Sequence, residues 1–210
     1  MSYYGSVALF RQLSKITSDD MSDAEVEDML EVASLVVLDD LSVLRKLETM
    51  TGEINGSNTV FYTRFKPIAD CNFDKSIDAS DITVYGWEED EEGNITLTVL
   101  SVSDITPELG KVTLASAPST DYDKIVATYR FYVIGTTPSW SLVDLATVYY
   151  AIHLAYVTLK GLLPVSFKLG SLSVSYGRRG EEKPHRIFYE KYRDIIERIA
   201  GLSIGYGGSQ

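Results

Sequence analysis

The chain has 210 residues, of which 45% are hydrophobic and 23% charged, so it is long enough and apolar enough to bury a core. Its net charge of −11 argues against a general nucleic-acid binder, which normally carries a basic surplus. Cys71 is the sole cysteine, which excludes a disulfide framework and any zinc or redox site built on a CxxC pair.

The charge is unevenly distributed along the chain. From Lys160 onward there are nine Lys and Arg against five Asp and Glu, so residues 1–159 carry a net charge of −15. Either this is ordinary solubilising charge, or an acidic body with a basic end meets an acidic partner.

The N-terminal quarter predicts helices. Residues 2–18 hold one apolar cluster that fits a short helix or an ordered arm. Ser22 and Glu25 then form an S-x-x-E capping box, in which each side chain bonds to the other residue's backbone N–H. Apolar residues follow at steps of three and four, which predicts an amphipathic helix from about Asp23 to Glu48. These residues are Val26, Leu30, Ala33, Val37, Leu41 and Leu44.

The pattern then changes to that of strands. Five segments rich in Val, Ile, Thr and Tyr are bounded by Gly, Pro, Asn or Asp, as expected in a small antiparallel module. They are residues 59–65, 82–87, 94–102, 111–117 and 124–133. The stretch 58–135 therefore predicts a five-stranded β-sandwich or barrel.

Residues 139–164 predict a helix that is apolar nearly all round. Ser139 or Ser141 fits the N-cap, and Gly161 and Pro164 are typical stop signals. Such a helix is covered by its own domain, by other copies or by a membrane. We expect cover from both its own subunit and a neighbouring copy. The residues predicted at the interface between copies are Tyr149, Tyr150, His153 and Tyr156.

Polar side chains argue against a membrane span. Asp144, Thr147, His153, Thr158 and Lys160 interrupt the helix, and its apolar runs are much shorter than the roughly 20 residues that a span needs. The N-terminus also lacks the basic start of a signal peptide. We expect a soluble protein made in the cytoplasm, with no membrane partner.

The C-terminal part predicts an arm and a last helix. Residues 166–176 alternate apolar and polar side chains, as a strand or extended arm does, and a basic turn with Arg178 and Arg179 follows. Pro184 fits the first turn of a helix that Gly201 terminates. The glycine-rich tail beyond it is typical of a flexible terminus.

The predicted fold class is α+β. Helices from both ends of the chain must share one core, since none of them buries its apolar face alone. The predicted parts are a helical core of residues 1–57 and 136–200, an inserted antiparallel β module of residues 58–135, and a C-terminal tail of residues 201–210.

A loop at residues 70–81 has the order of an EF-hand-type calcium loop. Oxygen side chains occupy positions 1, 3, 5, 9 and 12, and position 7 would donate its carbonyl. Lys75 stands where a glycine normally makes the sharp turn, and the flanks are predicted strands. The alternative is a polar loop held by Asx turns. The candidate ligands of a structural Ca²⁺, the one cofactor considered, are Asp70, Asn72, Asp74, Ser76, Asp78 and Asp81.

The sequence gives little support to catalysis. His153 and His185 lie in different helical segments, and an acidic loop is expected to raise the pKa of the Cys71 thiol, away from a nucleophile. G-x-S-x-G, P-loop, G-x-G-x-x-G and HExxH motifs are absent from the sequence. We therefore expect a protein that is not an enzyme.

Three stretches together resemble the head–tail connector, or adaptor, proteins of tailed bacterial and archaeal viruses. The first is the β module with its cadence PIAD, ITVY, GKVTLASAP and YRFY. The second is the helix ATVYYAIHLAYVTLKGLLP with the arm SFKLGSLSVSYG, and the third is the final amphipathic helix with its loose tail. The resemblance covers about residues 22–210.

The resemblance implies a structural virion protein located in the neck, at the head–tail junction. Such a protein forms a homo-oligomeric ring, a dodecamer in this family, which docks on the portal protein and meets a tail or neck-completion protein, while genomic DNA passes through its lumen. The C-terminal segment is then the portal-binding part. Its predicted partner-binding residues are Arg178, Arg179, Gly201, Leu202, Ile204, Tyr206 and Gln210.

A second interpretation follows from the residues alone. The chain would be a calcium-stapled β binding or adhesion module, carried on a helical stalk, of a tail or surface protein.

Overall fold

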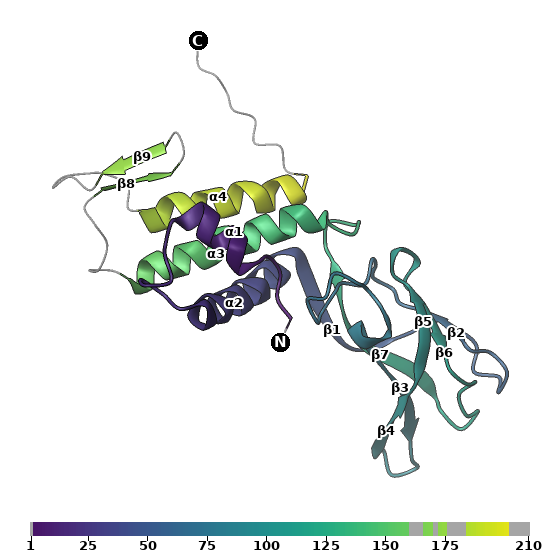
Figure 1. Cartoon of the computed structure of the whole chain (residues 1–210). Coiled ribbons are helices and arrows are strands. Elements are labelled where there is room, and N and C mark those ends of the chain that lie inside the picture. The colour runs from purple at the N-terminus through teal and green to yellow at the C-terminus, as the bar shows by residue number, and fades with distance from the viewer. Residues whose placement is uncertain (1, 160–165, 170–171, 176–183, 202–210) are drawn as a thin grey trace. The chain divides into compact units, whose positions relative to one another are not determined.

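The computed structural model of the chain describes four stretches, residues 2–159, 166–169, 172–175 and 184–201. The chain divides into two units, which we call the helical unit (Met1–Asp40 with Pro138–Gln210) and the β unit (Leu41–Thr137). The β unit thus interrupts the helical unit in sequence, and the fold is α+β (Figure 1). The first boundary lies at residue 40, whereas the sequence predicted residue 57.

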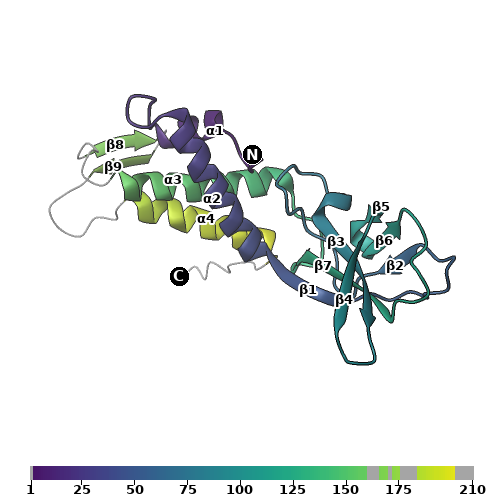
Figure 2. The same ribbon diagram turned by 90° about the horizontal axis from the view of Figure 1, so that it is seen from below.

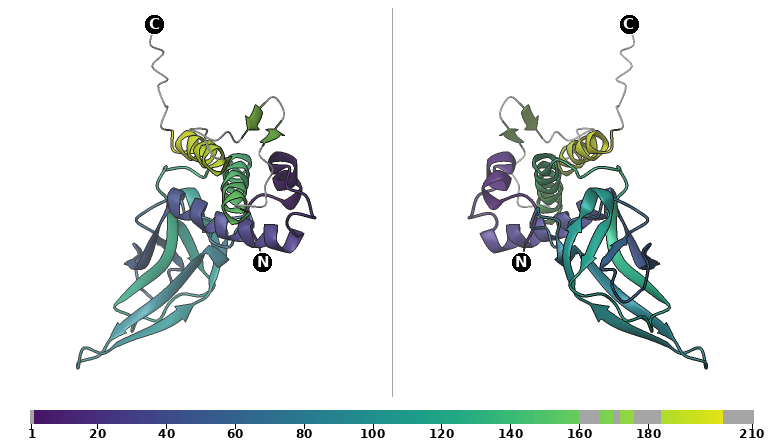
Figure 3. Two further views of the ribbon diagram at one scale, coloured as in Figure 1. Left: turned by 90° about the vertical axis from the view of Figure 1, so that its left-hand side faces the viewer. Right: turned by 90° about the vertical axis from the view of Figure 1, so that its right-hand side faces the viewer.

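The helical unit is organised around one central helix. Seen end-on, α3 lies in the middle of the other helices (Figure 3), and α4 runs beside it (Figure 2). The helices of the described residues are α1 (Val7–Ser14), α2 (Asp23–Leu41), α3 (Trp140–Thr158) and α4 (Pro184–Ile199). Their shared core consists of Phe10, Ile16, Met21, Val26, Leu30, Ala33, Val148, Ala151, Ile152, Ala155, Tyr156, Leu159 and Phe188.

The absence of a polar face on α3 follows from this central position. Its alanines at positions 146, 151 and 155 are fully buried and let neighbouring helices approach closely. Each fully buried Val or Ile on it contributes roughly 1.5–3 kcal/mol of apolar burial. Within the described residues, no helix is long and apolar enough to cross a membrane.

The start of α3 differs in detail from the prediction. Ser139 is the N-cap residue, but its side chain makes no capping bond. Asp144 accepts a hydrogen bond from the Gly5 N–H at 2.7 Å. The predicted stop signals, Gly161 and Pro164, lie outside the described residues.

The first residues of the chain are anchored to α2 and α3. Besides the Gly5 bond to Asp144, the Tyr4 N–H donates to Ser34 Oγ at 2.9 Å, and the Tyr4 ring stacks on Trp140. Gly5 has a φ of +84°, and a Cβ there would lie 2.8 Å from a methyl of Val148. Only glycine fits this position without strain.

The predicted start of α2 is confirmed and its predicted end is wrong. The Ser22 N–H donates to Glu25 Oε2 at 2.8 Å and the Glu25 N–H to Ser22 Oγ at 3.3 Å, which completes the capping box. The helix ends at Leu41, however, and β1 (Ser42–Thr49) follows. Leu44 fits the helical spacing by chance, since it is 42% exposed on a strand whose backbone pairs with β7.

The β unit contains two antiparallel sheets rather than a closed barrel. One has the strand order β1-β7-β3-β4 and the other β2-β6-β5. The predicted strand at 94–102 is in fact two strands, β4 and β5, which belong to different sheets. The strands after β1 are β2 (Val60–Tyr62), β3 (Ile82–Glu89), β4 (Ile95–Leu100), β5 (Val102–Thr106), β6 (Lys111–Leu114) and β7 (Lys124–Tyr132).

Both sheets contribute to a single core. In β3 of the first sheet and β6 of the second, buried side chains alternate with more exposed ones, which is the period of a half-buried strand. The shared core consists of Met50, Phe61, Ile68, Ile82, Val84, Ile105, Val112, Leu114, Ile125, Ala127 and Tyr129.

The C-terminal part agrees with the prediction at one helix end and differs in the extended segment. Residues 166–176, predicted as one strand or extended arm, contain two strands, β8 (Ser166–Leu169) and β9 (Leu172–Ser175), which pair antiparallel. Gly201, with a φ of +69°, follows the end of α4, and its N–H donates to the carbonyl of Arg198 at 3.2 Å.

The capping box at the start of α2 can be tested by a single substitution. Ser22→Ala removes the acceptor of the Glu25 N–H, so we expect the free energy of unfolding to fall by about 1 kcal/mol in urea titration. Ser18→Ala, at an exposed position four residues earlier, is the control and should change stability by less than about 0.5 kcal/mol. Equal effects of the two substitutions would contradict the capping role.

The anchored N-terminus gives a second prediction. Gly5→Ala adds both a strained φ and a contact with Val148, whereas Gly201→Ala adds only the strained φ, since nothing lies within 4 Å of its Cβ. We expect Gly201→Ala to cost about 1 kcal/mol and Gly5→Ala about 1–3 kcal/mol more. Thermal and urea unfolding of both variants measure the difference, and a difference near zero would show that the N-terminal segment is not packed as described.

Candidate functional site

The residues predicted at an interface between copies lie against α4 of the same chain. Together with the aromatic residues of α4 that they contact, they form a set that we call the aromatic cluster. In it the rings of α3 interleave with those of α4. Its members are Tyr149, Tyr150, His153 and Tyr156 of α3, and Phe188, Tyr189 and Tyr192 of α4.

Tyr156 belongs to the core of its own chain. It is 5% exposed, its ring stacks on Phe188 with the ring centroids 5.4 Å apart, and its hydroxyl donates to the carbonyl of Ser14 at 2.8 Å. Its surface is therefore already covered within the subunit.

The other three predicted interface residues are half-buried. The Tyr150 ring meets the edge of Tyr192 at a centroid distance of 4.9 Å. His153 Nδ1 lies 2.6 Å from the carbonyl oxygen of His185, and since a carbonyl only accepts, this nitrogen carries the proton. Burial raises the pKa of Tyr149. These rings keep part of their surface free for another contact.

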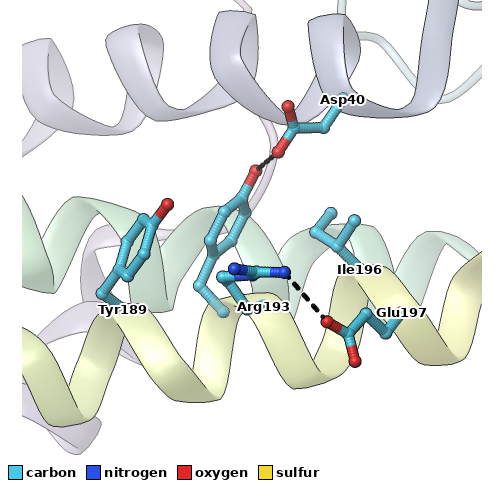
Figure 4. A pocket seen from close by; sticks show the side chains of 6 residues that line it. Asp40, Tyr189, Arg193, Ile196 and Glu197 are labelled. Atoms are coloured by element: carbon cyan, nitrogen blue, oxygen red, sulfur yellow. Dashed lines mark hydrogen bonds and ion pairs between the residues drawn. The ribbon is translucent and has the colours of Figure 1, made fainter. Parts of the chain in front are cut away.

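A pocket of about 270 Å³ opens beside the aromatic cluster (Figure 4). The Tyr192 hydroxyl donates to Asp40 Oδ2, which joins α4 to the last turn of α2. Arg193 Nη2 contacts Glu197 Oε1 at 3.2 Å one turn further along α4. The lining residues are Asp40, Tyr189, Tyr192, Arg193, Ile196 and Glu197.

Tyr192 and its neighbour Tyr150 stay protonated at neutral pH. Burial, and then the hydrogen bond to Asp40, raise the pKa of Tyr192 above its ordinary value. Burial also raises the pKa of Tyr150, with smaller contributions from Tyr189 and Asp40. The Tyr192 hydroxyl therefore acts as the donor in its hydrogen bond to Asp40 rather than as a base.

The candidate calcium loop is held by hydrogen bonds to its own backbone. Asp70 is fully buried, and its two oxygens accept the N–H groups of Phe73 and Lys75, each at 2.8 Å. Asp74 Oδ1 accepts the Ser76 N–H at 2.7 Å. These are the Asx-type turns of the alternative interpretation.

Hydrogen bonds from the loop's own backbone also hold its second half. Asp78 Oδ1 accepts the Ser80 N–H at 2.8 Å, and Asp81 Oδ1 accepts the Cys71 N–H at 2.6 Å. Asn72 Nδ2 donates to Ser80 Oγ at 2.8 Å. In the part of the chain that the structure describes, no three acidic, His or Cys side chains converge on a point that could hold a metal ion. A structural Ca²⁺ here stays a prediction.

Burial perturbs two titratable groups of this loop. It raises the pKa of the Cys71 thiol to about 11, with the charge of Asp81 adding to the effect, so the predicted direction is confirmed. Burial also raises the pKa of Asp81 to about 6, against the two backbone N–H bonds that favour its charged form.

Most of the predicted portal-binding residues fall outside the described residues. These are Arg178, Arg179, Leu202, Ile204, Tyr206 and Gln210. Gly201, the remaining member, is exposed at the end of α4.

Sequence reasoning missed Asp40. In the sequence it is one acidic residue in a helix, and its partner Tyr192 lies 152 positions away. Nothing local distinguishes it from its neighbour Asp39.

No known family model matches the chain, and no curated protein matches it in sequence.

The pKa of Asp81 gives a pH-dependent prediction. Because about 6 lies above the ordinary 3.8, the folded chain holds a proton between pH 4 and 6 that the unfolded chain has released. The stability that this proton provides is full below pH 4 and is lost as the pH rises through 6. In Asp81→Asn we therefore expect the difference in unfolding free energy between pH 4.5 and pH 7.5 to change by about 2 kcal/mol.

Asp78→Asn is the matched control in the same loop. Hydrogen bonds from Ser80 lower the pKa of this exposed carboxyl, so its stabilising effect is lost as the pH falls, which is the opposite sign. If the two variants shifted the pH dependence in the same direction, the assignment of the raised pKa to Asp81 would be wrong.

Proposed function

We propose that this chain is a head–tail connector of a tailed virus. It assembles with copies of itself as a ring in the neck, a dodecamer by resemblance, docks on the portal protein and joins it to the tail, while DNA passes through the lumen. The observation that supports this best is the aromatic cluster, whose half-buried rings lie beside an open pocket on the same helices.

Aromatic side chains are the residues that most often carry protein–protein contacts, because they bury a large area at a small cost in side-chain entropy. Tyr189 is 40% exposed next to Tyr150 and His153, so a partner would bury additional ring surface there. The pocket between Asp40 and Glu197 could receive one anchoring side chain from the next subunit.

The charge distribution is compatible with DNA passing through without being bound. Residues 1–159 carry −15, and an acidic wall repels phosphate rather than releasing counterions from it. The role proposed for this body is structural and not catalytic.

The basic C-terminal part is the proposed portal contact. It carries a surplus of four positive charges from Lys160 onward, and its helix α4 ends at Ile199, two residues before exposed Gly201. The residues proposed to contact the portal are Arg178, Arg179, Gly201, Leu202, Ile204, Tyr206 and Gln210.

Light scattering coupled to size-exclusion chromatography, with and without a portal ring, tests this proposal. We expect the full chain to form rings on the portal. Removal of residues 202–210 should abolish portal binding, and Tyr189→Glu should reduce ring formation at least tenfold by placing a charge among the rings. Leu109→Glu, at a residue 55% exposed in the β unit, is the matched control and should leave both unchanged. A chain that ignores the portal with or without its last residues would refute the proposal.

A further inference from the structure

Strand β4 is an open edge of the four-stranded sheet (Figure 1). It pairs with β3 over six residues without a register shift, and among the described residues no strand pairs with its other side. An edge of this kind presents a row of backbone N–H and C=O groups that can bind another strand.

The apolar side chains of β4 are exposed on one face. Ile95, Leu97 and Val99 are 51%, 39% and 66% exposed, and they alternate with Thr96 and Thr98 on the other face. Soluble proteins normally interrupt such an edge with a charge, a proline or a bulge. β4 has none of these.

The opposite edge of the same sheet is protected. In β1 the register shifts between Arg45 and Glu48, and Leu47 has a φ of +51°. Lys46 is exposed beside this bulge. A bulge and a lysine are two of the usual ways to block pairing. The contrast singles out β4 as the edge that is left open.

The hydrogen-bond pattern shows which groups of β4 are available. The carbonyl of Trp87, the residue opposite Leu97, accepts the Asp123 N–H at 2.9 Å and so points away from β4. Leu97 therefore belongs to a non-hydrogen-bonded pair, and its own N–H and C=O point to the open edge. The same holds for Ile95 and Val99, because bonded and non-bonded pairs alternate.

We propose that β4 pairs antiparallel with β4 of a second copy, about a two-fold axis at Leu97. The segment Ile-Thr-Leu-Thr-Val has the same pattern of apolar residues and threonines in both directions. In this register Leu97 faces the partner's Leu97, and Ile95 faces the partner's Val99. The outward backbone groups of these residues then form about six hydrogen bonds between the copies. An isologous contact of this kind requires a self-complementary strand, and β4 is one.

The acidic turn between β3 and β4, residues 90–93, is compatible with this register. The Asp90 N–H donates to the carbonyl of Asn94, which lies three residues before Leu97, so the two turns are about 20 Å apart on opposite sides of the axis. This separation is more than twice the Debye length of about 8 Å at physiological salt. The strands therefore join without bringing the two acidic turns together.

The contact is small, so the dimer is expected to dissociate on dilution. It uses only residues of the β unit and does not rest on the connector proposal. Sedimentation velocity of the full chain without portal should show a concentration-dependent mass that increases toward twice 23.3 kDa.

Introducing a charge at the axis is the decisive experiment. Leu97→Lys and Leu97→Glu each place two like charges face to face, so each variant alone should associate at least tenfold more weakly. An equimolar mixture of the two variants should recover dimers, because a lysine from one copy then meets a glutamate from the other across the axis. Leu44→Lys, on the protected edge, is the matched control and should leave the dimer unchanged.

A second variant keeps the test independent of charge. Val99→Pro removes an outward N–H that β3 does not use, so far-UV circular dichroism should stay unchanged while the dimer is lost. The proposal is overturned if Leu97→Lys leaves the mass unchanged or if the mixture fails to recover dimers. It is likewise overturned if Leu44→Lys is as disruptive as Leu97→Lys, which would indicate pairing of β4 with β1 of the next copy.

Discussion

The helical unit depends on the burial of one helix, α3, which has no polar face to turn toward water. Residues from both ends of the chain supply its cover, so the helical unit is complete only when both segments are present. The hydrogen bond from Gly5 to Asp144 shows how early residues are recruited, since it joins positions 139 apart in sequence. The burial of α3 thus explains why the β unit is an insertion and not a separate terminal domain.

Local sequence patterns predicted correctly those features that depend on residues close together in the chain. The Ser22–Glu25 capping box and the glycine after α4 were both predicted, because each depends on residues within one turn. The end of α2 was not predicted. Leu44 satisfies a helical spacing and a strand equally well, and the decision comes from its pairing with Arg130 of β7, far along the chain.

Prediction of the site from local sequence is limited in the same way. The Asp and Asn pattern of the loop at 70–81 satisfies either a calcium ion or the backbone N–H groups of the loop, and only geometry separates the two. Asp40 and Tyr192 meet through tertiary packing that no local pattern encodes. The aromatic residues of α3 were recognised as unusual, but their packing against α4 of the same chain required the structure.

The two ends of the β unit lie next to each other. Strands β1 and β7 pair with Ser42 opposite Tyr132, and the Val133 N–H donates to the carbonyl of Leu41 at 3.1 Å. The chain therefore enters and leaves the β unit through neighbouring strands, and a short turn could bridge the same gap. This geometry makes the β unit an exchangeable cassette: evolution could replace, enlarge or delete it while the helices that surround α3 keep their connections.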